Sequence, residues 1–576
     1  MSDAHAAHAP QSFWSRYVFS QDHKIIGLQY LITAMVMALV AAGLAVLIRI
    51  QLAWPGSLGI MMTPETYIAI VTMHGSLMVF FVVSLALVSG FGNFLIPLHV
   101  GARDMAYPFL NMLSYWVIVP ACLLMLISFF VPGGAAAAGW TSYPPLSALK
   151  EAVPGSDWGQ TLWLLAMALF IVSFTMGGLN YLTTILNCRA PGMSMMRMPL
   201  STWTFLISAV LGLLTFPALT AAAVMLLFDR HLGTSFFLPS GMVIGGKVLP
   251  HEGGTPLLFQ HLFWFLGHPE VYVLVLPAMG IAFDVNSAMS RRAPFGYKVT
   301  VVSLLVAAVL SMIVWGHHMF TTGMNPYVGE YFSIMTVLIT VPFAVIGVNL
   351  IASLFKGRIK FTTASLFGLG LISAIGLGGF GGLYLGTAAS DLYFHETYFV
   401  VGHFHMMIGV VTFFGTFAGL YFWFPKMFGR LMNERLGRVH FWLTIVGTFA
   451  TFLLMHFQGM GHLVRRTFES AYDFQKPVTG MHYAITFFSV MAVAGQFVFL
   501  YNFFRSIWRG EKAARNPWNA AGLEWTTESP APHGNWRGPV PQVQRWAYEY
   551  GRNGHAEDFQ LQAEPDRVGA TEPAAH

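Results

Sequence analysis

The sequence is poor in charge and in cysteine. Only 10% of its 576 residues are charged, less than half of the quarter that is usual in a soluble domain. Hydrophobic residues make up 56% of the chain. The composition excludes a soluble enzyme, a fibre and a disordered protein, and it predicts a polytopic integral membrane protein. Two cysteines, Cys122 and Cys188, are too few for a disulfide framework, and no basic domain supports nucleic-acid binding.

Twelve apolar runs reach the length of about 20 residues that a helix needs to cross a bilayer. They cover approximately residues 25–50, 68–97, 107–131, 160–186, 199–228, 256–283, 299–318, 333–355, 364–386, 397–424, 439–460 and 479–507. The sequence therefore predicts an all-α polytopic fold with twelve transmembrane helices. Three parts are expected: a polar segment without a signal peptide (1–24), the helical domain (25–507), and an extension (508–576) whose last 25 or so residues are disordered.

Basic residues are unevenly divided between two alternating sets of loops. The loops after even-numbered spans hold thirteen, namely Arg103, Arg189, Arg197, Arg291, Arg292, Lys298, Lys356, Arg358, Lys360, Lys426, Arg430, Arg435 and Arg438. The other loops hold six, namely Lys150, Arg230, Lys247, Arg465, Arg466 and Lys476. Because loops rich in Lys and Arg stay inside, both termini are predicted to be cytoplasmic. The outer pair Arg465-Arg466 breaks this rule, which indicates another task such as holding an anion.

Six histidines lie within the apolar runs, where an ionisable side chain is costly and marks a functional site. They are His74, His268, His317, His318, His403 and His405. Imidazole suits iron and copper, so the set predicts a buried site with several metals. His403 and His405 are two residues apart, which separates their side chains by about 200° on a helix. One helix is therefore expected to serve two metal centres.

The remaining spacings suggest a grouping of the other ligands. His268 and Tyr272 are four residues apart and share one helix face. The adjacent His317 and His318 can reach one metal only where the backbone departs from a regular helix, which the preceding glycine permits. Three imidazoles from two helices would suit a copper ion with an open position. His74 is left as a second axial ligand for another centre.

Six segments carry a resemblance to a known family. They are FWFLGHPEVYVLVLP (263–277), IVWGHHMFTTGMNP (313–326), HETYFVVGHFHMMIG (395–409), NFLIPLHVGARDMAYP (93–108), TILNCRAPGMSMMRMPL (184–200) and NPWNAAGLEWTTESP (516–530). They resemble subunit I of the cytochrome c oxidases, in the haem-copper oxidase superfamily, over about residues 18–540. The resemblance implies a terminal respiratory oxidase subunit that reduces O2 to water with electrons from cytochrome c, takes up protons and pumps protons.

The resemblance implies two haems and one copper ion. By this resemblance, the ligands are His74 and His405 for a low-spin haem, His403 for a high-spin haem, and His268, His317 and His318 for the copper. Both haems are expected to be of haem a type. The Arg465-Arg466 pair matches arginines that hold haem propionates, to which guanidinium groups bind well.

Further residues near these centres are also assigned by the resemblance. Tyr272 corresponds to the tyrosine that the family links to a copper histidine, here His268, and it would supply an electron and a proton. Trp264 is counted among the cofactor-binding residues. His395 and Glu396 replace the usual His-Asp pair of an outer site, where glutamate could still bind magnesium or manganese with a changed geometry.

Glu270 lies within the sixth span, two residues from a copper ligand, and intramembrane carboxyl groups mark proton paths. A protonated glutamic acid in a polar cavity is the alternative interpretation. By resemblance, a proton route of the D type begins at Asp104, passes Asn93 and Asn111, and ends at Glu270.

The chain departs from the family at a second proton route, the K type. Phe343 and Ile346 stand where a threonine and a lysine are expected, and neither side chain can support a water chain. Only scattered hydroxyl groups, such as Ser333, Thr336 and Thr340, occupy that span. A single proton route through the D-type residues is therefore favoured.

Three other functions were weighed. A nitric oxide reductase shares the six histidines, and the absent K-type residues would suit one, but this class generally lacks a tyrosine such as Tyr272. A quinol oxidase has His and Gln where this chain has Thr66 and Ala69, so cytochrome c is the favoured donor. A transporter would not need two histidines on opposite faces of one helix.

The resemblance implies a subunit II with a dinuclear copper centre, a subunit III and small subunits as partners, in a bacterial inner membrane rather than a mitochondrial one.

Overall fold

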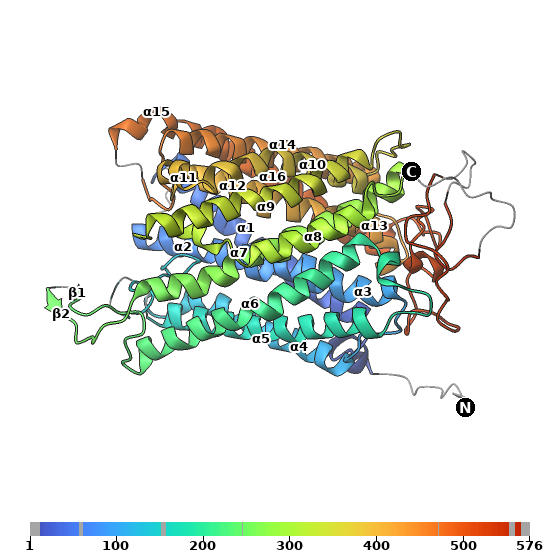
Figure 1. The fold of residues 1–576 in the computed structure, drawn as a ribbon, viewed down its shortest axis with the longest axis horizontal. Coiled ribbons are helices and arrows are strands. Elements are labelled where there is room, and N and C mark those ends of the chain that lie inside the picture. The colour runs from blue at the N-terminus through green and yellow to red at the C-terminus, as the bar shows by residue number, and fades with distance from the viewer. Residues whose placement is uncertain are drawn as a thin grey trace.

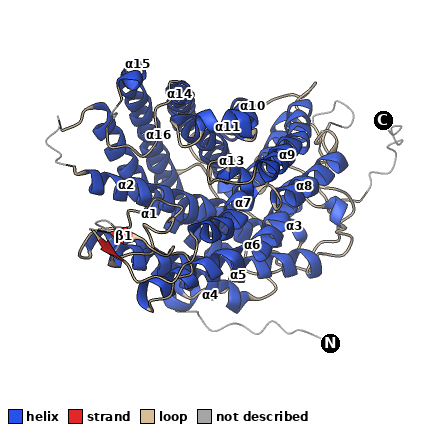
Figure 2. Ribbon diagram, turned by 60° about the vertical axis from the view of Figure 1, so that its left-hand side comes forward, coloured by secondary structure: helices blue, strands red, loops and turns tan. Residues whose placement is uncertain are grey.

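The computed structural model describes residues 12–56, 62–150, 152, 157–244, 246–469, 472–551 and 559–565, which form a bundle of long helices running along one axis (Figures 1 and 2). The α-helices are α1 (His23–Ala53), α2 (Pro64–Ser76), α3 (Gly92–Val100), α4 (Pro108–Ile127), α5 (Trp158–Asn187), α6 (Leu200–His231), α7 (Pro256–Ser290), α8 (Tyr297–Ser311), α9 (Pro326–Ala352), α10 (Thr363–Leu385), α11 (Ala388–Phe394), α12 (Tyr398–Phe404), α13 (Val411–Phe428), α14 (Glu434–Met460), α15 (Lys476–Thr479) and α16 (Met481–Arg509).

Shorter elements connect or continue these helices. The π-helices are η1 (Trp14–Val18), η2 (Leu77–Phe91) and η6 (His405–Val410). The 3-10 helices are η3 (Ser128–Phe130), η4 (Met195–Arg197), η5 (Trp315–Met319), η7 (Asp473–Gln475) and η8 (Leu523–Thr526). A small antiparallel hairpin pairs β1 (Val243–Ile244) with β2 (Lys247–Val248). It projects from the left-hand end of the bundle in Figure 1, and we call this end the hairpin face.

Within the described residues, eleven helical segments are long and apolar enough to cross a membrane, which agrees with an all-α, multi-pass membrane protein. They correspond to eleven of the twelve predicted runs. The run predicted over 299–318 is different: α8 has 15 residues, and the 3-10 helix η5 follows it after a short irregular stretch. The backbone therefore departs from a regular α-helix at His317 and His318, as the predicted sharing of one metal requires.

The helices differ in how much of their surface the protein covers. Helix α7 and the continuous α2–η2–α3 segment are buried over 89% of their most apolar stretch, whereas α16 is buried over 22%. Helix α7 packs along α6, α10 and α13, and η2 packs along α1. Prolines stand in the first turn of α2, α4, α7 and α9, where the missing N–H costs no hydrogen bond. The α12–η6–α13 segment is buried over 78%, and together with α7 and α2–η2–α3 it carries four of the six histidines predicted to bind metal.

Two inner segments change from α- to π-helix beside a predicted ligand. Segment η2 begins three residues after His74, and η6 begins at His405. Within η2 the Ser84 hydroxyl donates to the carbonyl of Val79, five residues earlier, at 2.8 Å. Each turn of a π-helix contains an additional residue, and such segments occur frequently at functional sites. The side chains after each π-helical segment therefore point in a different direction from the one they would have if the α-helix had continued.

The C-terminal segment, residues 510–551 and 559–565, covers the end of the bundle opposite the hairpin (red in Figure 1), and we call this end the C-terminal face. The Trp518 indole donates to the carbonyl of Phe422 at 2.7 Å, so this part of the segment lies against the end of α13. The residues predicted to be disordered lie mostly outside the described ones. Within the described stretch 559–565, the Gln562 side chain is fully buried and accepts from the Leu523 amide.

The C-terminal segment contains a buried carboxyl group, that of Glu524, whose protonation depends on pH. Burial raises the pKa of the Glu524 carboxyl from 4.5 to about 7, so folding favours its protonated form. That contribution to stability is complete below pH 4.5 and is lost as the pH rises through 7. We therefore expect amide hydrogen exchange in residues 510–551 to accelerate between pH 6 and pH 8, beyond the intrinsic change. The Glu524→Gln variant should lack this acceleration, and equal protection of the unaltered protein at both pH values would contradict the prediction.

Candidate metal centres and proton route

Three imidazole rings converge where η5 meets α7. The available nitrogens of His268, His317 and His318 all lie within 4.8 Å of one another. The closest pairs are the Nε2 atoms of His317 and His318, at 3.0 Å, and His268 Nδ1 with His318 Nε2, at 3.3 Å. Only one proton can lie between two such nitrogens, whereas a single cation can accept a lone pair from all three. The donor set therefore fits a metal that prefers imidazole, such as copper.

Neighbouring side chains hold two of these rings in place. His317 Nδ1 lies 2.9 Å from the Thr336 hydroxyl. The His318 ring stacks on Trp264, with centroids 3.8 Å apart and planes 9° from parallel. The Trp264 indole in turn donates to the Tyr143 hydroxyl. Such outer contacts orient metal ligands and select their tautomer. Sequence reasoning did not identify Tyr143, which lies in a loop outside the motifs.

Tyr272 lies beside the three-histidine cluster, and its ring centroid is 4.8 Å from that of His268. The predicted covalent link between these two side chains stays a prediction. On the other side, the Phe343 ring centroid is 5.2 Å from that of Tyr272, and Ile346 is fully buried. The two residues that replace the K-type pair thus fill space with hydrocarbon near the tyrosine.

His74 and His405 form a second arrangement. Their ring centroids are 6.4 Å apart and their planes 12° from parallel. His74 Nδ1 is bound to the Ala41 carbonyl at 3.0 Å and His405 Nδ1 to the Val401 carbonyl at 2.9 Å. Nδ1 must carry the proton in each ring, which leaves both Nε2 lone pairs available. Metal–nitrogen bonds of about 2 Å on both sides would separate the centroids by about 6 Å, so the pair fits two axial ligands of one metal.

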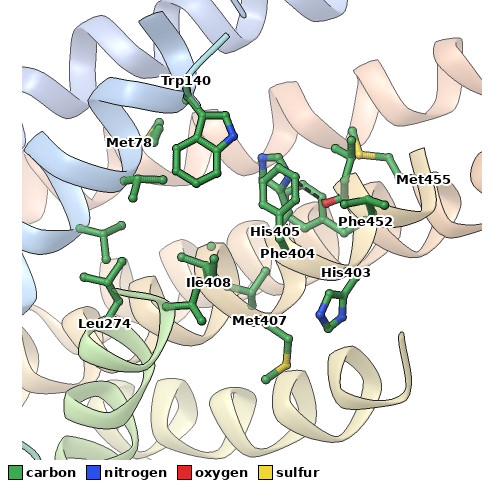
Figure 3. Close-up of a pocket in the computed structure, with 18 of the residues that line it drawn as sticks. Met78, Trp140, Leu274, His403, Phe404, His405, Met407, Ile408, Phe452 and Met455 are labelled. Carbon is green, nitrogen blue, oxygen red and sulfur yellow. Dashed lines mark hydrogen bonds between the residues drawn. The ribbon is translucent and has the colours of Figure 1, made fainter. Parts of the chain in front are cut away.

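His403 points away from His405, although only Phe404 separates them in the chain (Figure 3). Its Nδ1 is bound to the Gly378 carbonyl on α10 at 2.9 Å, so Nε2 is again the free lone pair. A Cβ atom at Gly382 would approach His403 Cε1 to 3.1 Å, which shows how closely α10 backs the ring. The short α12–η6 segment therefore presents one imidazole to each side.

A cavity of about 600 Å³ joins all these groups, and the six histidines, Tyr272 and Glu270 line it. Apolar side chains of α13 and α14, including Phe413, Phe417 and Phe452, line its remainder. The guanidinium of Arg49 also reaches the cavity, and its Nη1 atom is buried without a partner among the described residues. The cavity is thus a largely apolar chamber with a few placed polar groups, which is suitable for large planar cofactors.

The predicted propionate and outer-metal residues lie at the rim of this cavity towards the hairpin face. Arg465 donates two hydrogen bonds to the Glu396 carboxylate, one of them 2.6 Å long from Nε to Oε2. Burial alone would raise the pKa of Glu396, but Arg465 and Arg466 hold it at about 2. Arg466 Nη2 is buried and without a partner in the described ranges. His395 Nδ1 lies 2.8 Å from an Asp391 oxygen, so His395 and Glu396 share the rim but have different partners.

Glu270 and Asp104 lie apart, at the two ends of the predicted proton route. Glu270 is 2% exposed, and its Oε1 accepts from the Ser84 hydroxyl at 3.3 Å. Asp104 is half-buried in the loop after α3, where burial raises the pKa of its carboxyl. Asn93 Oδ1 and both amide atoms of Asn111, the residues predicted to continue the route, are buried without partners in the part of the chain that the structure describes. Internal water usually satisfies such groups.

Sequence reasoning missed a set of hydroxyl groups next to these asparagines. The Tyr30 hydroxyl lies 3.0 Å from Ser114 Oγ and 3.3 Å from Ser173 Oγ. Ser114 donates to the carbonyl of Asn111 at 2.7 Å, which joins this set to the predicted route. The spacing of three residues between Asn111 and Ser114 was a usable signal, because it places both on one helix face.

Comparisons with known proteins agree with this geometry. The profile of the family described as "Cytochrome C and Quinol oxidase polypeptide I" matches residues 25–498. "Alternative cytochrome c oxidase subunit 1" of Bradyrhizobium diazoefficiens is 46% identical over 98% of this chain and 96% of its own. "Cytochrome c oxidase subunit 1" of Thermostichus vulcanus is 41% identical over 94% and 93%. A solved "heme-copper terminal oxidase dimer" shares the fold, with a TM-score of 0.68 at 18% identity over 85% and 84% of the two chains.

Histidine clusters on a shared internal cavity within a helical bundle define a membrane metalloenzyme. The chain belongs to the cytochrome c and quinol oxidase polypeptide I family, and it is the catalytic subunit of a terminal respiratory oxidase that carries haem and copper. It therefore acts together with other oxidase subunits. This membership removes the transporter from the alternatives weighed above.

Proposed function

We propose that the chain reduces O2 to water with electrons from cytochrome c, using His74 and His405 for one haem and His403 for another. The copper would be held by the three-histidine cluster on α7 and η5. One observation carries this assignment: neighbouring histidines on α12–η6 point to opposite sides, and one of them faces His74. The single helix can thus hold two centres at a fixed separation.

Haem and copper supply O2 binding and electron transfer when bound, and the protein positions them and handles protons. The Tyr272 hydroxyl can release a proton beside the copper ligands, because its ring adjoins His268. Glu270 Oε2 has no partner within the described ranges, so it can hold a proton and pass it on through water in the cavity. Apolar walls exclude other water from the chamber, which strengthens the interactions of these few polar groups.

The rim and wall of the cavity support the assignment of the haem substituents. Arg466 Nη2 has no partner in the described part of the chain, which suits a propionate, whereas Arg465 would share its guanidinium between a propionate and Glu396. Arg49 lines the same cavity, and its Nη1 is a buried donor without a partner among the described residues. A polar group on the macrocycle would satisfy it, and the phenylalanine-lined part of the chamber would accept a long apolar tail. Both features favour a haem a type cofactor.

The outer site for magnesium or manganese rests on His395 and Glu396. Both lie at the rim, but Glu396 is paired with Arg465 in the described structure. An ion at this place would have to share Glu396 with Arg465. His395 Nε2 has no hydrogen-bond partner among the described residues, and Asp391 already orients the ring.

Cytochrome c is the favoured donor because Thr66 and Ala69 replace the residues expected in a quinol oxidase. The names of relatives support this choice, and one relative from Aeropyrum pernix is a "Heme-copper oxidase subunit I+III". We therefore propose a subunit II with a dinuclear copper centre, a subunit III and small subunits as partners. The location would be the inner membrane of a bacterium.

Twelve crossings are proposed because both ends of the helical domain lie on one face. His23, at the start of α1, contacts Asn535 of the C-terminal segment, and Gly429 contacts Ala513 just after α16. An odd number of crossings would place these ends on opposite faces. Helix α8 together with η5 would supply the twelfth crossing, and the loop charges assign the C-terminal face to the cytoplasm.

The proton route is proposed to start at Asp104, to pass the asparagines and the Tyr30–Ser114–Ser173 hydroxyl cluster, and to end at Glu270. What supports it is the set of buried amide atoms of Asn93 and Asn111 without partners among the described residues, next to a buried cluster of hydroxyl groups that are hydrogen-bonded to one another. The hydrocarbon of Phe343 and Ile346 near Tyr272 supports the absence of a K-type route through that helix.

The copper assignment has a direct test. The His317→Ala variant of the purified complex is expected to lose the copper of this subunit, because two imidazoles hold the ion far less tightly than three. Metal analysis should show less copper per complex, and pyridine-haem analysis should still show two haems. Thr336→Val is the matched control, since it removes only an outer contact of the same histidine. Retention of all copper in His317→Ala would contradict the assignment.

A further inference from the structure

A short aromatic segment near the N-terminus lies against the outside of the bundle. We call residues 12–19 the aromatic segment. Its π-helix η1 covers Trp14–Val18, and none of these residues is buried. Four aromatic residues of the segment are strongly exposed, namely Phe13 (66%), Trp14 (64%), Tyr17 (43%) and Phe19 (51%). A contiguous group of exposed apolar side chains indicates a surface that contacts something other than water.

The aromatic segment folds back along two helices that begin at the C-terminal face. The Gln29 side chain on α1 donates to the carbonyls of Tyr17 and Val18 at 2.8 and 2.9 Å. The Trp116 indole on α4 donates to the same Val18 carbonyl at 3.1 Å, and its ring centroid lies 4.9 Å from that of Phe19. These donors lie six and eight residues into α1 and α4, about 9 and 12 Å from the helix starts. The segment is thus beside the first turns of two membrane-length helices and not beyond their ends.

The face of α1 that continues from Gln29 is apolar. Ile32, Val36 and Leu39 follow at helical spacing, and all three are exposed. Because α1 is long and apolar enough to span a membrane, this stripe is suited to contact lipid tails. Backbone carbonyls at the level of lipid need donors from the protein, since little water reaches them. This need accounts for Gln29, a polar side chain in line with an apolar stripe.

The composition of the aromatic segment fits the boundary between lipid headgroups and acyl chains. Tryptophan and tyrosine are enriched at that boundary. Arg16 is exposed, and its guanidinium lies 5.2 Å from the centroid of the Tyr17 ring. The segment contains no acidic residue, and the carboxylate that follows it, Asp22, is paired with Lys24 at 3.0 Å. Arg16 is therefore available for a phosphate, with which a guanidinium forms bidentate hydrogen bonds.

We propose that the aromatic segment is an anchor in the membrane interface, with its rings among the headgroups and Arg16 on a lipid phosphate. The partner is thus a lipid surface, and the segment fixes the height of the adjoining start of α1 in the bilayer. The loop charges place this contact in the cytoplasmic leaflet. The anchor does not depend on the assignment of the metal ligands or of the proton route.

The test places a nitroxide spin label on the purified complex in nanodiscs of phosphatidylcholine and phosphatidylglycerol. The label is attached to Tyr17→Cys in a chain that also carries Cys122→Ser and Cys188→Ser, which removes both native cysteines. Electron paramagnetic resonance then compares its accessibility to oxygen, which concentrates in lipid, with its accessibility to a water-soluble nickel chelate. Arg537→Cys is the control, because its side chain is exposed in the C-terminal segment. The oxygen-to-nickel ratio is expected to be severalfold higher at position 17 than at position 537.

Two results at position 17 would overturn the proposal. A ratio as low as that at position 537 would show that the segment faces water, and low accessibility to both reagents would show that another protein surface covers it. Phe13→Cys replaces Tyr17→Cys if that variant does not assemble, with the same expectations.

A second comparison tests the contacts that hold the segment. Gln29→Leu, added to Tyr17→Cys, is expected to lower the oxygen-to-nickel ratio, because the two carbonyls lose their donor and turn towards water. Thr33→Val is the matched control: Thr33 lies one turn further along α1 and contacts the Tyr115 hydroxyl of α4 at 3.1 Å, but not the segment. It should leave the ratio unchanged. An equal ratio in the two variants would overturn the fold-back geometry.

Discussion

The His403→Ala variant is expected to lose oxygen reduction by at least about 100-fold, because even an outer partner of a metal ligand is worth 10- to 100-fold. His405→Ala should instead remove the haem held with His74. The two side chains point to opposite sides of one helix, so their losses should be separable. Reduced-minus-oxidised spectra with and without carbon monoxide measure this. His403→Ala should lose the component that binds carbon monoxide, and His405→Ala the component that does not.

The adjacent Phe404 offers a control for this pair. It lies between the two histidines, and its ring centroid is 4.3 Å from that of His405. Phe404→Leu should retain both spectral components, because it changes packing without removing a nitrogen. Loss of the same component in both histidine variants would show that the two rings serve one centre.

The Asp104→Asn variant is expected to slow turnover by about 100-fold, as the removal of a proton-transferring group commonly does. If the route is single, the reduction of the binuclear centre and its later reoxidation should both be impaired. Flow-flash kinetics and anaerobic reduction kinetics measure the two phases separately. A normal reductive phase would reveal a second proton entrance. Glu270→Gln should have a similar effect on turnover.

The series arrangement of Asp104 and Glu270 gives an additional test. If both substitutions block the same proton route, their effects on the turnover rate are not additive. The Asp104→Asn, Glu270→Gln double variant should then be little slower than the slower of the two single variants. Asp22→Asn is a useful comparison, because Asp22 lies at the same entrance but its carboxylate also caps α1 through the Lys24 amide. A double variant slower by the product of both factors would place the two carboxyl groups on separate paths.

Much of the fold could be predicted because apolar runs and helix spacing are local signals. Eleven runs became membrane-length helices, and the spacing of His403 and His405 predicted that they point apart. The twelfth run was less predictable, because hydropathy does not show where α8 gives way to the 3-10 helix η5. The departure at His317 and His318 followed from the geometry that two adjacent ligands need, and not from composition.

What the sequence did not indicate depends on contacts between distant segments. Asn535 lies more than 500 residues from His23, and no spacing rule connects them. Tyr143 contacts Trp264 from a loop without a recognisable motif. Glu396 was assigned to a metal, and its pairing with Arg465 could not be foreseen, because the two residues meet only through the packing of α12 and the loop after α14.

The π-helical segments make the chain sensitive to changes in length. Removing one residue from the stretch after His405, 405–410, would let the backbone return to an α-helix, and the side chains beyond it would turn by about 100°. Helix α13 would then present a different face to α7 and α10, which it packs against. A deletion of one residue between Met406 and Val410 should be far more harmful than a substitution within the same five residues. Natural variation in this stretch is therefore expected to change residue identity and to preserve residue number.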